Sequence, residues 1–219
     1  RDDTTGIFTI LLDQNENRFS PSFCRNLSQA IACVEKAAHP KAMILTGGKS
    51  KFFSNGLDVD YMMKHPTDKD YILRVWDILA RILIMDCRTV AAINGHAFGA
   101  GLFLALACDF RIMRTKRGFV NFPELNLGMR LAKGFAELSK AKCSAPTLRE
   151  GVLTGKRYGS TDAIRAGLVD AECAMEELHD TALEWAKGGL ATSLKLINFN
   201  PQTFSQMKIE LYTDAYRAQ

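Results

Sequence analysis

The sequence predicts a single α/β domain, because short apolar runs alternate with stretches of helical periodicity. Runs of strand length occupy residues 8–12, 42–46 and 90–93. The stretches between them place apolar residues mostly three or four positions apart, which is the spacing of one helix face. A chain of 219 residues, 47% of them hydrophobic and 24% charged, is long and apolar enough for one full-sized core. Strand-then-helix order around one core is typical of the α/β class.

The helices can be placed from their start signals and their apolar spacing. Ser20-Pro21 is a helix start, since proline fits a first helical position, and this helix is expected to reach residue 37. Residues 68–85 read as a long amphipathic helix, and residues 111–114 as a short strand. The chain from residue 131 is expected to be helical, at residues 132–142, 145–153, 161–166 and 175–188, with one or two more helices over residues 193–219, interrupted at Pro201.

The segment between residues 90 and 107 is the most informative for function. Its apolar run ends at Asn94, a loop of glycines and alanines continues to Gly101, and an apolar helix is expected over residues 102–107. Small residues let another group approach the backbone. The unpaired N–H groups of a helix start, with the positive end of the helix dipole behind them, would face that group. This pattern favours a site for an anion or a developing oxyanion.

Two other interpretations fit the same segment. It is also what a simple packing turn between a strand and a helix looks like. A dinucleotide site is a third interpretation, since Gly99 and Gly101 match the first two glycines of G-x-G-x-x-G, but Leu104 stands where the third glycine belongs.

Two further segments add chemistry to this one. Gly56 lies in FFSNGLDV, residues 52–59, which follows the apolar run 42–46 across a loop rich in glycine and lysine. Two N–H groups from separate loops that meet at one oxygen form an oxyanion hole. Glu124 follows a proline among apolar residues, where a carboxyl group tends to have a raised pKa suited to proton transfer near neutral pH. Taken alone, Glu124 would be a surface acid beside a turn.

Four motifs, in order and at matching spacing, make the chain resemble the enoyl-CoA hydratase/isomerase superfamily. The motif F-x-A-G-A-D-[IL] is similar to FSNGLDV at residues 53–59, and N-G-x-A-x-G-G-G-x-[ED]-L-A-x-x-C-D is similar to residues 94–109. The motif F-x-x-P-E-x-x-[LI]-G is similar to VNFPELNLG at residues 120–128, and a later motif ending in G-L-V-D is similar to residues 155–170. The resemblance implies a crotonase-like (ββα)n spiral core with a C-terminal helical region. We therefore expect a core domain over residues 1–190 and a C-terminal helical segment over residues 191–219, shorter than is usual in the family, as a truncation would leave it.

One departure from the family pattern selects among its reactions. Hydratases of the family carry a glutamate on the helix after the glycines, and Phe103 stands at that position. Hydration uses two carboxylates, and Phe103 cannot activate water. Glu124, the carboxylate of the third motif, is retained. A single base is what the family's 3,2-enoyl-CoA isomerases keep, so the resemblance implies an isomerase of unsaturated fatty acid β-oxidation.

The resemblance also assigns roles to residues. Glu124 would be the catalytic base, and the backbone N–H groups of Leu57 and Ala100 would hold the thioester oxygen. Other residues at matching positions would bind the substrate, namely Arg18, Ser54, Asn55, Gly56 and Phe103. Coenzyme A would be part of the substrate, no separate cofactor or metal is implied, and a homotrimer or dimer of trimers is expected.

Two alternative functions stay open. One is other acyl-CoA chemistry, such as a hydratase, thioester hydrolase or dehalogenase. The other is a non-catalytic acyl-CoA-binding protein, which is favoured by Arg130-Leu131-Ala132-Lys133 in place of the family's usual Pro-Gly loop after Gly128.

Composition narrows the class of protein and its location. The net charge of +4 is mild, no basic patch interleaved with aromatic residues is visible in the sequence, and nucleic-acid binding is not expected. No apolar run is long enough for a membrane span. The six cysteines are scattered and the four histidines lack ligand spacing; of these, only His96 lies near the predicted site, where packing is its simplest role. An intracellular location is expected: the peroxisome, glycosome or mitochondrial matrix, or the cytoplasm of a bacterium.

Overall fold

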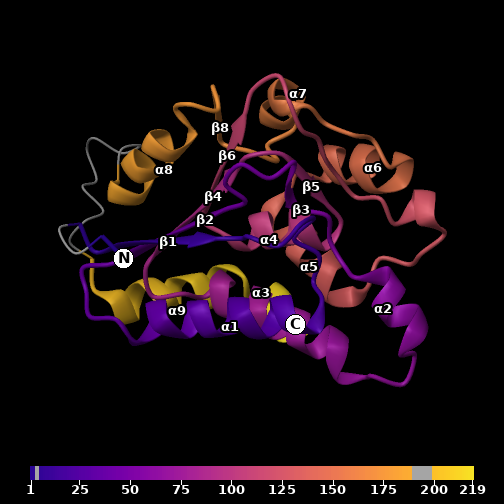
Figure 1. Cartoon of the computed structure of the whole chain (residues 1–219), viewed down its shortest axis with the longest axis horizontal. Coiled ribbons are helices and arrows are strands. Elements are labelled where there is room, and N and C mark those ends of the chain that lie inside the picture. The colour runs from indigo at the N-terminus through magenta and orange to yellow at the C-terminus, as the bar shows by residue number, and fades with distance from the viewer. Residues whose placement is uncertain (3–4, 189–198) are drawn as a thin grey trace.

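Two parallel β-sheets form the framework of the molecule (Figure 1). The computed structural model describes residues 1–2, 5–188 and 199–219. The larger sheet has the strand order β1-β2-β4-β6-β8, and the smaller has the order β3-β5-β7. The strands are β1 (Ile7–Leu11), β2 (Ala42–Thr46), β3 (Phe52–Ser54), β4 (Arg88–Ile93), β5 (His96–Phe98), β6 (Phe110–Arg114), β7 (Val120–Asn121) and β8 (Ala171–Cys173).

The chain visits the two sheets in turn and then forms a helix. Strand β2 of the large sheet is followed by β3 of the small one, β4 by β5, and β6 by β7. Helices follow each pair, so a strand-strand-helix unit is repeated along a spiral. The crotonase-like (ββα)n architecture is thus confirmed. One consequence matters for the site: the three strands of the small sheet are parallel, and their carboxyl ends lie at the same edge.

Helices cover both faces of the large sheet. Along β2, Met43 and Leu45 point into the main core with α1 and α3, whereas Ile44 points into a second apolar cluster with α8. Figure 1 shows this arrangement, with α1, α3 and α9 in one layer and α8 on the other side of the sheet. The helices are α1 (Pro21–Lys36), α2 (Val59–Lys64), α3 (Asp70–Leu83), α4 (Ala100–Ala107), α5 (Lys133–Lys142), α6 (Ala145–Thr154), α7 (Ser160–Arg165), α8 (Leu178–Lys187), α9 (Pro201–Leu211) and α10 (Thr213–Ala218).

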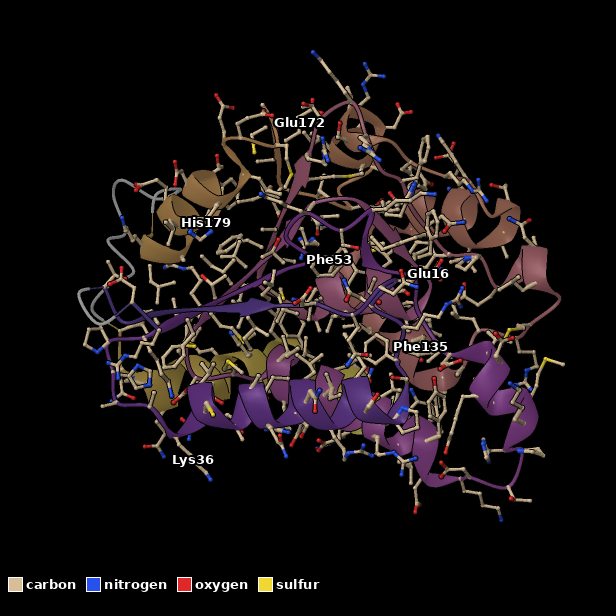
Figure 2. The ribbon with its side chains drawn as sticks, viewed as in Figure 1. Glu16, Lys36, Phe53, Phe135, Glu172 and His179 are labelled. Carbon is tan, nitrogen blue, oxygen red and sulfur yellow. The ribbon has the colours of Figure 1, made fainter. Side chains whose placement is uncertain are left out.

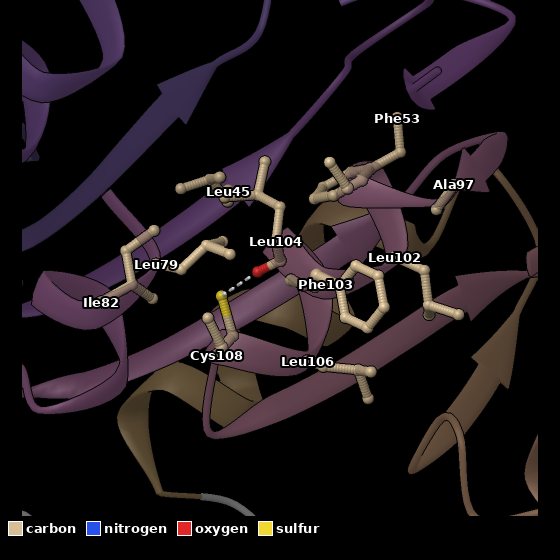
Figure 3. Packing of buried hydrophobic residues seen from close by; sticks show 14 of the residues in the cluster. Leu45, Phe53, Leu79, Ile82, Ala97, Leu102, Phe103, Leu104, Leu106 and Cys108 are labelled. Atoms are coloured by element: carbon tan, nitrogen blue, oxygen red, sulfur yellow. Dashed lines mark hydrogen bonds between the residues drawn. The ribbon is translucent and has the colours of Figure 1, made fainter. Parts of the chain in front are cut away.

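Helix α4 runs through the centre of the core. Every residue from Ala100 to Ala107 is buried, so this helix has no polar face. Figure 3 shows its leucines and Phe103 among side chains from the sheets and from α3. A short helix that is apolar all round is stable only when other elements surround it. The start of α4 is therefore held in one place by packing on every side.

Most of the predicted elements are confirmed within one to three residues. Helix α1 begins at Pro21, and its cap Ser20 accepts a hydrogen bond from the N–H of Phe23 at 3.2 Å. The predicted tail differs, because Pro201 begins helix α9 instead of interrupting a helix. Residues 193–198 of that predicted segment lie outside the described residues, as does the predicted domain boundary at residue 190, which stays a prediction.

The predicted glycine loop was wrong in its details. Residues 96–98 form strand β5 and α4 already begins at Ala100, so only Gly99 separates them. Strands β3, β7 and β8 and helix α2 were likewise not predicted. The physical reason is length, since strands of two or three residues are too short to show an alternating pattern, and the six residues of α2 make fewer than two helical turns. These short strands become recognisable only through their partners, such as Phe52 beside His96.

A buried ion pair fastens the C-terminal helices to the core. Lys208 of α9 is 5% exposed, and its Nζ lies 2.8 Å from Oδ2 of Asp109 and 3.1 Å from the carbonyl oxygen of Cys87. Next to it, the ammonium group of Lys142 lies 4.0 Å from the centre of the Tyr212 ring, and burial lowers the pKa of Lys142 to about 8. Buried charges such as these are stable only when they are paired or hydrogen-bonded. Helices α9 and α10 are therefore part of the folded domain.

Candidate active site

The three segments singled out in the sequence all leave the same edge of the small sheet. Residues 55–58 follow β3, Gly99 follows β5, and Phe122-Pro123-Glu124 follows β7. Ligands of parallel α/β proteins bind at the carboxyl ends of strands, where loops and helix starts converge. The small sheet thus gathers into one place residues that lie more than 60 positions apart in the chain.

The loop after β3 leaves one backbone donor unused. The N–H of Asn55 donates to the carbonyl oxygen of Glu16 at 2.9 Å, and the N–H of Gly56 donates to Ser54 Oγ at 3.2 Å. The N–H groups of Asp58 and Val59 also have acceptors within the protein. The Leu57 N–H has none among the residues that the structure describes. It is therefore the group in this loop that is available to a ligand.

The direction of the Leu57 N–H follows from its own peptide group. The carbonyl oxygen of Gly56, in the same peptide plane, accepts from the N–H of Phe19 at 2.9 Å. In a trans peptide the C=O and N–H point in opposite directions. The Leu57 N–H therefore points away from Phe19, and Gly56 adopts φ +80° to allow the turn.

The start of helix α4 supplies a second donor. The carbonyl oxygen of Gly99 accepts from the N–H groups of Leu102 and Phe103, at 2.8 and 3.1 Å. The Ala100 N–H of the same peptide therefore points out of the helix, and no acceptor for it lies within the described part of the chain. Ala100 is 2% exposed, so little water shields the positive end of the helix dipole behind it.

The two donors lie close together. A Cβ atom placed on Gly56 would be 3.2 Å from the nitrogen of Ala100 and 2.5 Å from the carbonyl oxygen of Phe98. Only glycine fits this contact, which brings the loop carrying Leu57 against the helix start carrying Ala100. Two N–H groups from separate segments at such close range form the arrangement that binds an oxyanion.

Glu124 brings a carboxyl group to the same place. Its Oε1 lies 3.8 Å from where a Cβ on Gly99 would be, next to Ala100. Its Oε2 is buried and has no hydrogen-bond partner among the described residues. Burial raises the pKa of Glu124, because removal from water disfavours the charged form of the carboxyl group. A carboxyl group in this state can both accept and return a proton.

The residues predicted to bind the substrate occupy different surroundings. The guanidinium of Arg18, 40% exposed, pairs with Glu16 at 2.7 Å, and Asn55 donates its side-chain N–H to the same carboxylate at 2.8 Å. These two partners lower the pKa of Glu16. Ser54 is fully buried and donates to the carbonyl oxygen of Asn17 at 2.6 Å. These contacts shape the loop, while direct contacts of Arg18, Ser54, Asn55 and Gly56 with a ligand stay predictions.

Phe103 lies in the main core, in contact with two other aromatic rings. Its ring is 0% exposed and lies 4.3 Å from Phe135, nearly parallel, and 5.6 Å from Phe122. In Figure 2, Phe135 and Glu16 lie on the same side of the central Phe53, towards α2. Position 103 therefore supplies a buried ring and no carboxylate. The predicted contact between Phe103 and a substrate stays a prediction.

Two asparagines that were not predicted as site residues hold the loops together. Asn17 donates from Nδ2 to the carbonyl oxygens of Phe52 and Phe53, at 3.2 and 3.1 Å. Asn94 accepts from the N–H of Gly47 and donates to the carbonyl oxygen of Ser50, both at 2.8 Å. Both side chains are 0% exposed. Asn94 precedes Gly95, which predicts a turn but not a buried side chain, and the sequence around Asn17 contains no comparable signal.

His96 has a packing role in the structure. Its Nδ1 accepts from the N–H of Phe119 at 3.2 Å, and its ring lies beside those of Phe98 and Phe119. Within the described residues, no group of three His, Cys, Asp or Glu side chains is placed to hold a metal ion. None of the described helices is long and apolar enough to cross a membrane.

The chain is similar to known proteins in sequence and in fold. The sequence profile of the family described as Enoyl-CoA hydratase/isomerase matches residues 2–214. Enoyl-CoA delta isomerase 3 of Arabidopsis thaliana is 29% identical over 215 residues, which cover 94% of this chain and 88% of the relative. The peroxisomal Enoyl-CoA delta isomerase 2 of the same plant is 29% identical over 74% of this chain and 70% of its own. The human mitochondrial delta3-delta2-enoyl-CoA isomerase has the same fold, with a TM-score of 0.87, 21% identity, and coverage of 99% of this chain and 83% of its own.

Proposed function

The chain belongs to the enoyl-CoA hydratase/isomerase family, and on that premise we propose that it moves the double bond of a 3-enoyl-CoA to give the trans-2-enoyl-CoA. The observation that carries this proposal is the single carboxyl group of Glu124, half-buried beside Gly99 and the unused N–H of Ala100. The place at which hydratases of the family carry their second carboxylate is occupied by Phe103, a fully buried ring.

The proposed mechanism uses one base and two donors. The thioester oxygen lies between the N–H groups of Leu57 and Ala100, and Glu124 takes a proton from carbon 2. The resulting dienolate carries its negative charge largely on the thioester oxygen, where the two N–H groups stabilise it. The protonated Glu124 then delivers the proton to carbon 4, so no proton is gained or lost overall. One such donor contributes about 3 kcal/mol in comparable reactions, and a positioned base about a hundredfold or more in rate.

The preference for isomerisation over hydration rests on position 103, because relatives named for either reaction are similar to this chain. Two of them are named as delta isomerases and match most of this chain. Water addition would need a second group to activate water, and the ring of Phe103 excludes water at that point. The expected homotrimer and the organelle stay predictions.

Comparison of two substrates with one preparation tests the proposed reaction. The protein is expected to convert 3-hexenoyl-CoA to 2-hexenoyl-CoA, and to hydrate crotonyl-CoA at least about a hundredfold more slowly, the usual minimum for losing a positioned base. Absorbance of the conjugated thioester follows both reactions. Faster hydration than isomerisation would contradict the proposal, and binding of both thioesters without turnover would favour a non-catalytic acyl-CoA-binding protein.

The pH dependence of isomerisation is set by Glu124. The base must be deprotonated in the free enzyme, so kcat/KM is expected to rise with pH and then level off. Burial raises the pKa of Glu124, which places the midpoint above the ordinary glutamate value of about 4.3. A profile of kcat/KM against pH for 3-hexenoyl-CoA checks this. A midpoint at or below the ordinary value would mean that Glu124 is solvated or that another group is the base.

A further inference from the structure

Tyr71 contacts the backbone of the loop that carries Leu57. It lies in the first turn of α3, is 3% exposed, and its Oη accepts a hydrogen bond from the Asp58 N–H at 2.9 Å. This is a contact between segments 13 residues apart, made by a side chain to the backbone. None of the sequence motifs contains Tyr71.

Leu57 is held between two restrained peptide groups. On its N-terminal side, the carbonyl oxygen of Gly56 accepts from Phe19 at 2.9 Å. On its C-terminal side, the peptide joining Leu57 to Asp58 donates to Tyr71. Because an oxyanion donor must point at the place where charge develops, both restraints act on the direction of the Leu57 N–H.

The surroundings of Tyr71 make this contact rigid. Burial raises the pKa of Tyr71, so its hydroxyl group stays protonated. The hydroxyl oxygen accepts the hydrogen bond in this neutral form. The ring of Tyr61 from α2 packs 5.3 Å from that of Tyr71. The Asp58 carboxylate accepts from the N–H of Tyr61 at 3.0 Å and so caps α2. Helix α3, α2 and the loop therefore meet at the Tyr71 side chain.

We propose that Tyr71 is a positioning residue, which aims the Leu57 N–H at the thioester oxygen through its hydrogen bond to the Asp58 N–H. The effect of Tyr71 on turnover rests on the proposed isomerase function. The direction of the N–H, however, governs how any acyl-CoA thioester is polarised when bound.

Removal of one oxygen atom tests this role. In Tyr71→Phe the Asp58 N–H loses its acceptor, and the loop can turn the Leu57 N–H away from its target. We expect kcat for 3-hexenoyl-CoA to fall about tenfold with KM within about twofold, since a misdirected donor weakens transition-state stabilisation more than substrate binding. Loss of the whole donor would cost more, about 100- to 1,000-fold.

Tyr61→Phe is the matched control. The Tyr61 hydroxyl donates to Asp68 at 2.8 Å and has no contact with the loop's backbone, although both rings lie in the same cluster. We expect its kcat to stay within about twofold of that of the parent protein. Equal losses in the two variants would mean that the aromatic cluster matters only for folding, and would overturn the proposal.

A spectroscopic readout separates positioning from general damage. The infrared carbonyl band of bound 2-hexenoyl-CoA, labelled with ¹³C at carbon 1, moves to lower frequency when N–H groups polarise the thioester. The shift is expected to be smaller in Tyr71→Phe than in the parent and unchanged in Tyr61→Phe. An unchanged band in Tyr71→Phe would overturn the proposal. If Tyr71→Phe fails to fold, a chain with 3,5-difluorotyrosine in place of Tyr71 keeps the shape and weakens the acceptor, and the same smaller shift is expected.

The two proposals can fail separately. If the parent protein binds 2-hexenoyl-CoA but does not isomerise 3-hexenoyl-CoA, the proposed function fails while the carbonyl band still reports on Tyr71. If the parent isomerises and both variants keep its band and its kcat, only the role of Tyr71 is overturned.

Discussion

Replacement of Glu124 by glutamine is expected to lower kcat for 3-hexenoyl-CoA by at least about a hundredfold. Glutamine keeps the size and much of the hydrogen bonding of the side chain but cannot accept the proton from carbon 2. Affinity for the product thioester should persist, because the donors at Leu57 and Ala100 are backbone groups that the change does not remove. Steady-state rates together with calorimetric titration of 2-hexenoyl-CoA measure the two effects.

Thermal unfolding provides the control for Glu124→Gln. The pKa of Glu124 is raised in the folded state, so above the unfolded-state pKa its ionised form destabilises the native protein. This penalty grows as the pH rises from the unfolded-state pKa to the raised folded-state pKa, and it disappears as the pH falls below the unfolded-state value. The uncharged glutamine should therefore melt at an equal or higher temperature at pH 7. A stable variant with activity within a few-fold of the parent would remove Glu124 from the mechanism.

The second large effect is expected at a backbone group. Ala100→Pro removes the N–H that faces out of helix α4, whereas Ala100→Gly keeps it. The proline variant should lose about 100- to 1,000-fold in kcat, as expected when an oxyanion donor is lost. The glycine variant should stay near the parent, since the family often has glycine at this position. Rates for 3-hexenoyl-CoA with the two variants side by side give the comparison.

Position 100 is the first residue of α4, where proline is tolerated, but the tight contact with the Gly56 loop makes a folding check necessary. Circular dichroism and melting establish whether the proline variant is folded. A folded proline variant that binds 2-hexenoyl-CoA and turns over normally would mean that the start of α4 is only a packing turn, the simplest interpretation of these small residues.

The sequence predicted the long elements well because their burial leaves a pattern. Helix α3 alternates buried and exposed residues with helical spacing, and apolar runs of four residues make up most of β2 and β4. The small sheet left no such pattern. Its strands have two or three residues each, and they are stabilised by pairing with one another across gaps of more than 20 positions. Long-range pairing of this kind cannot be read from local sequence.

Parts of the candidate site could be predicted where backbone geometry or a motif restricts the residue type. Gly56 must be glycine because φ is +80° and a Cβ would touch Phe98, and Glu124 follows a proline in a recognisable motif. The supporting contacts were not predictable. Asn17 and Tyr71 act on backbone groups that are distant in the chain, and neither residue type indicates on its own which loop it will hold.

The aromatic cluster of Phe103, Phe122 and Phe135 has a consequence for how this protein could acquire a new reaction. A glutamate introduced at position 103 alone would put a charge between two rings with no partner, in a place that is now 0% exposed. Such a change costs stability before it can yield a water-activating carboxylate. To gain hydratase chemistry, in evolution or by design, the protein would therefore need substitutions at Phe122 and Phe135 before one at Phe103. The order of the substitutions decides whether each intermediate protein stays folded.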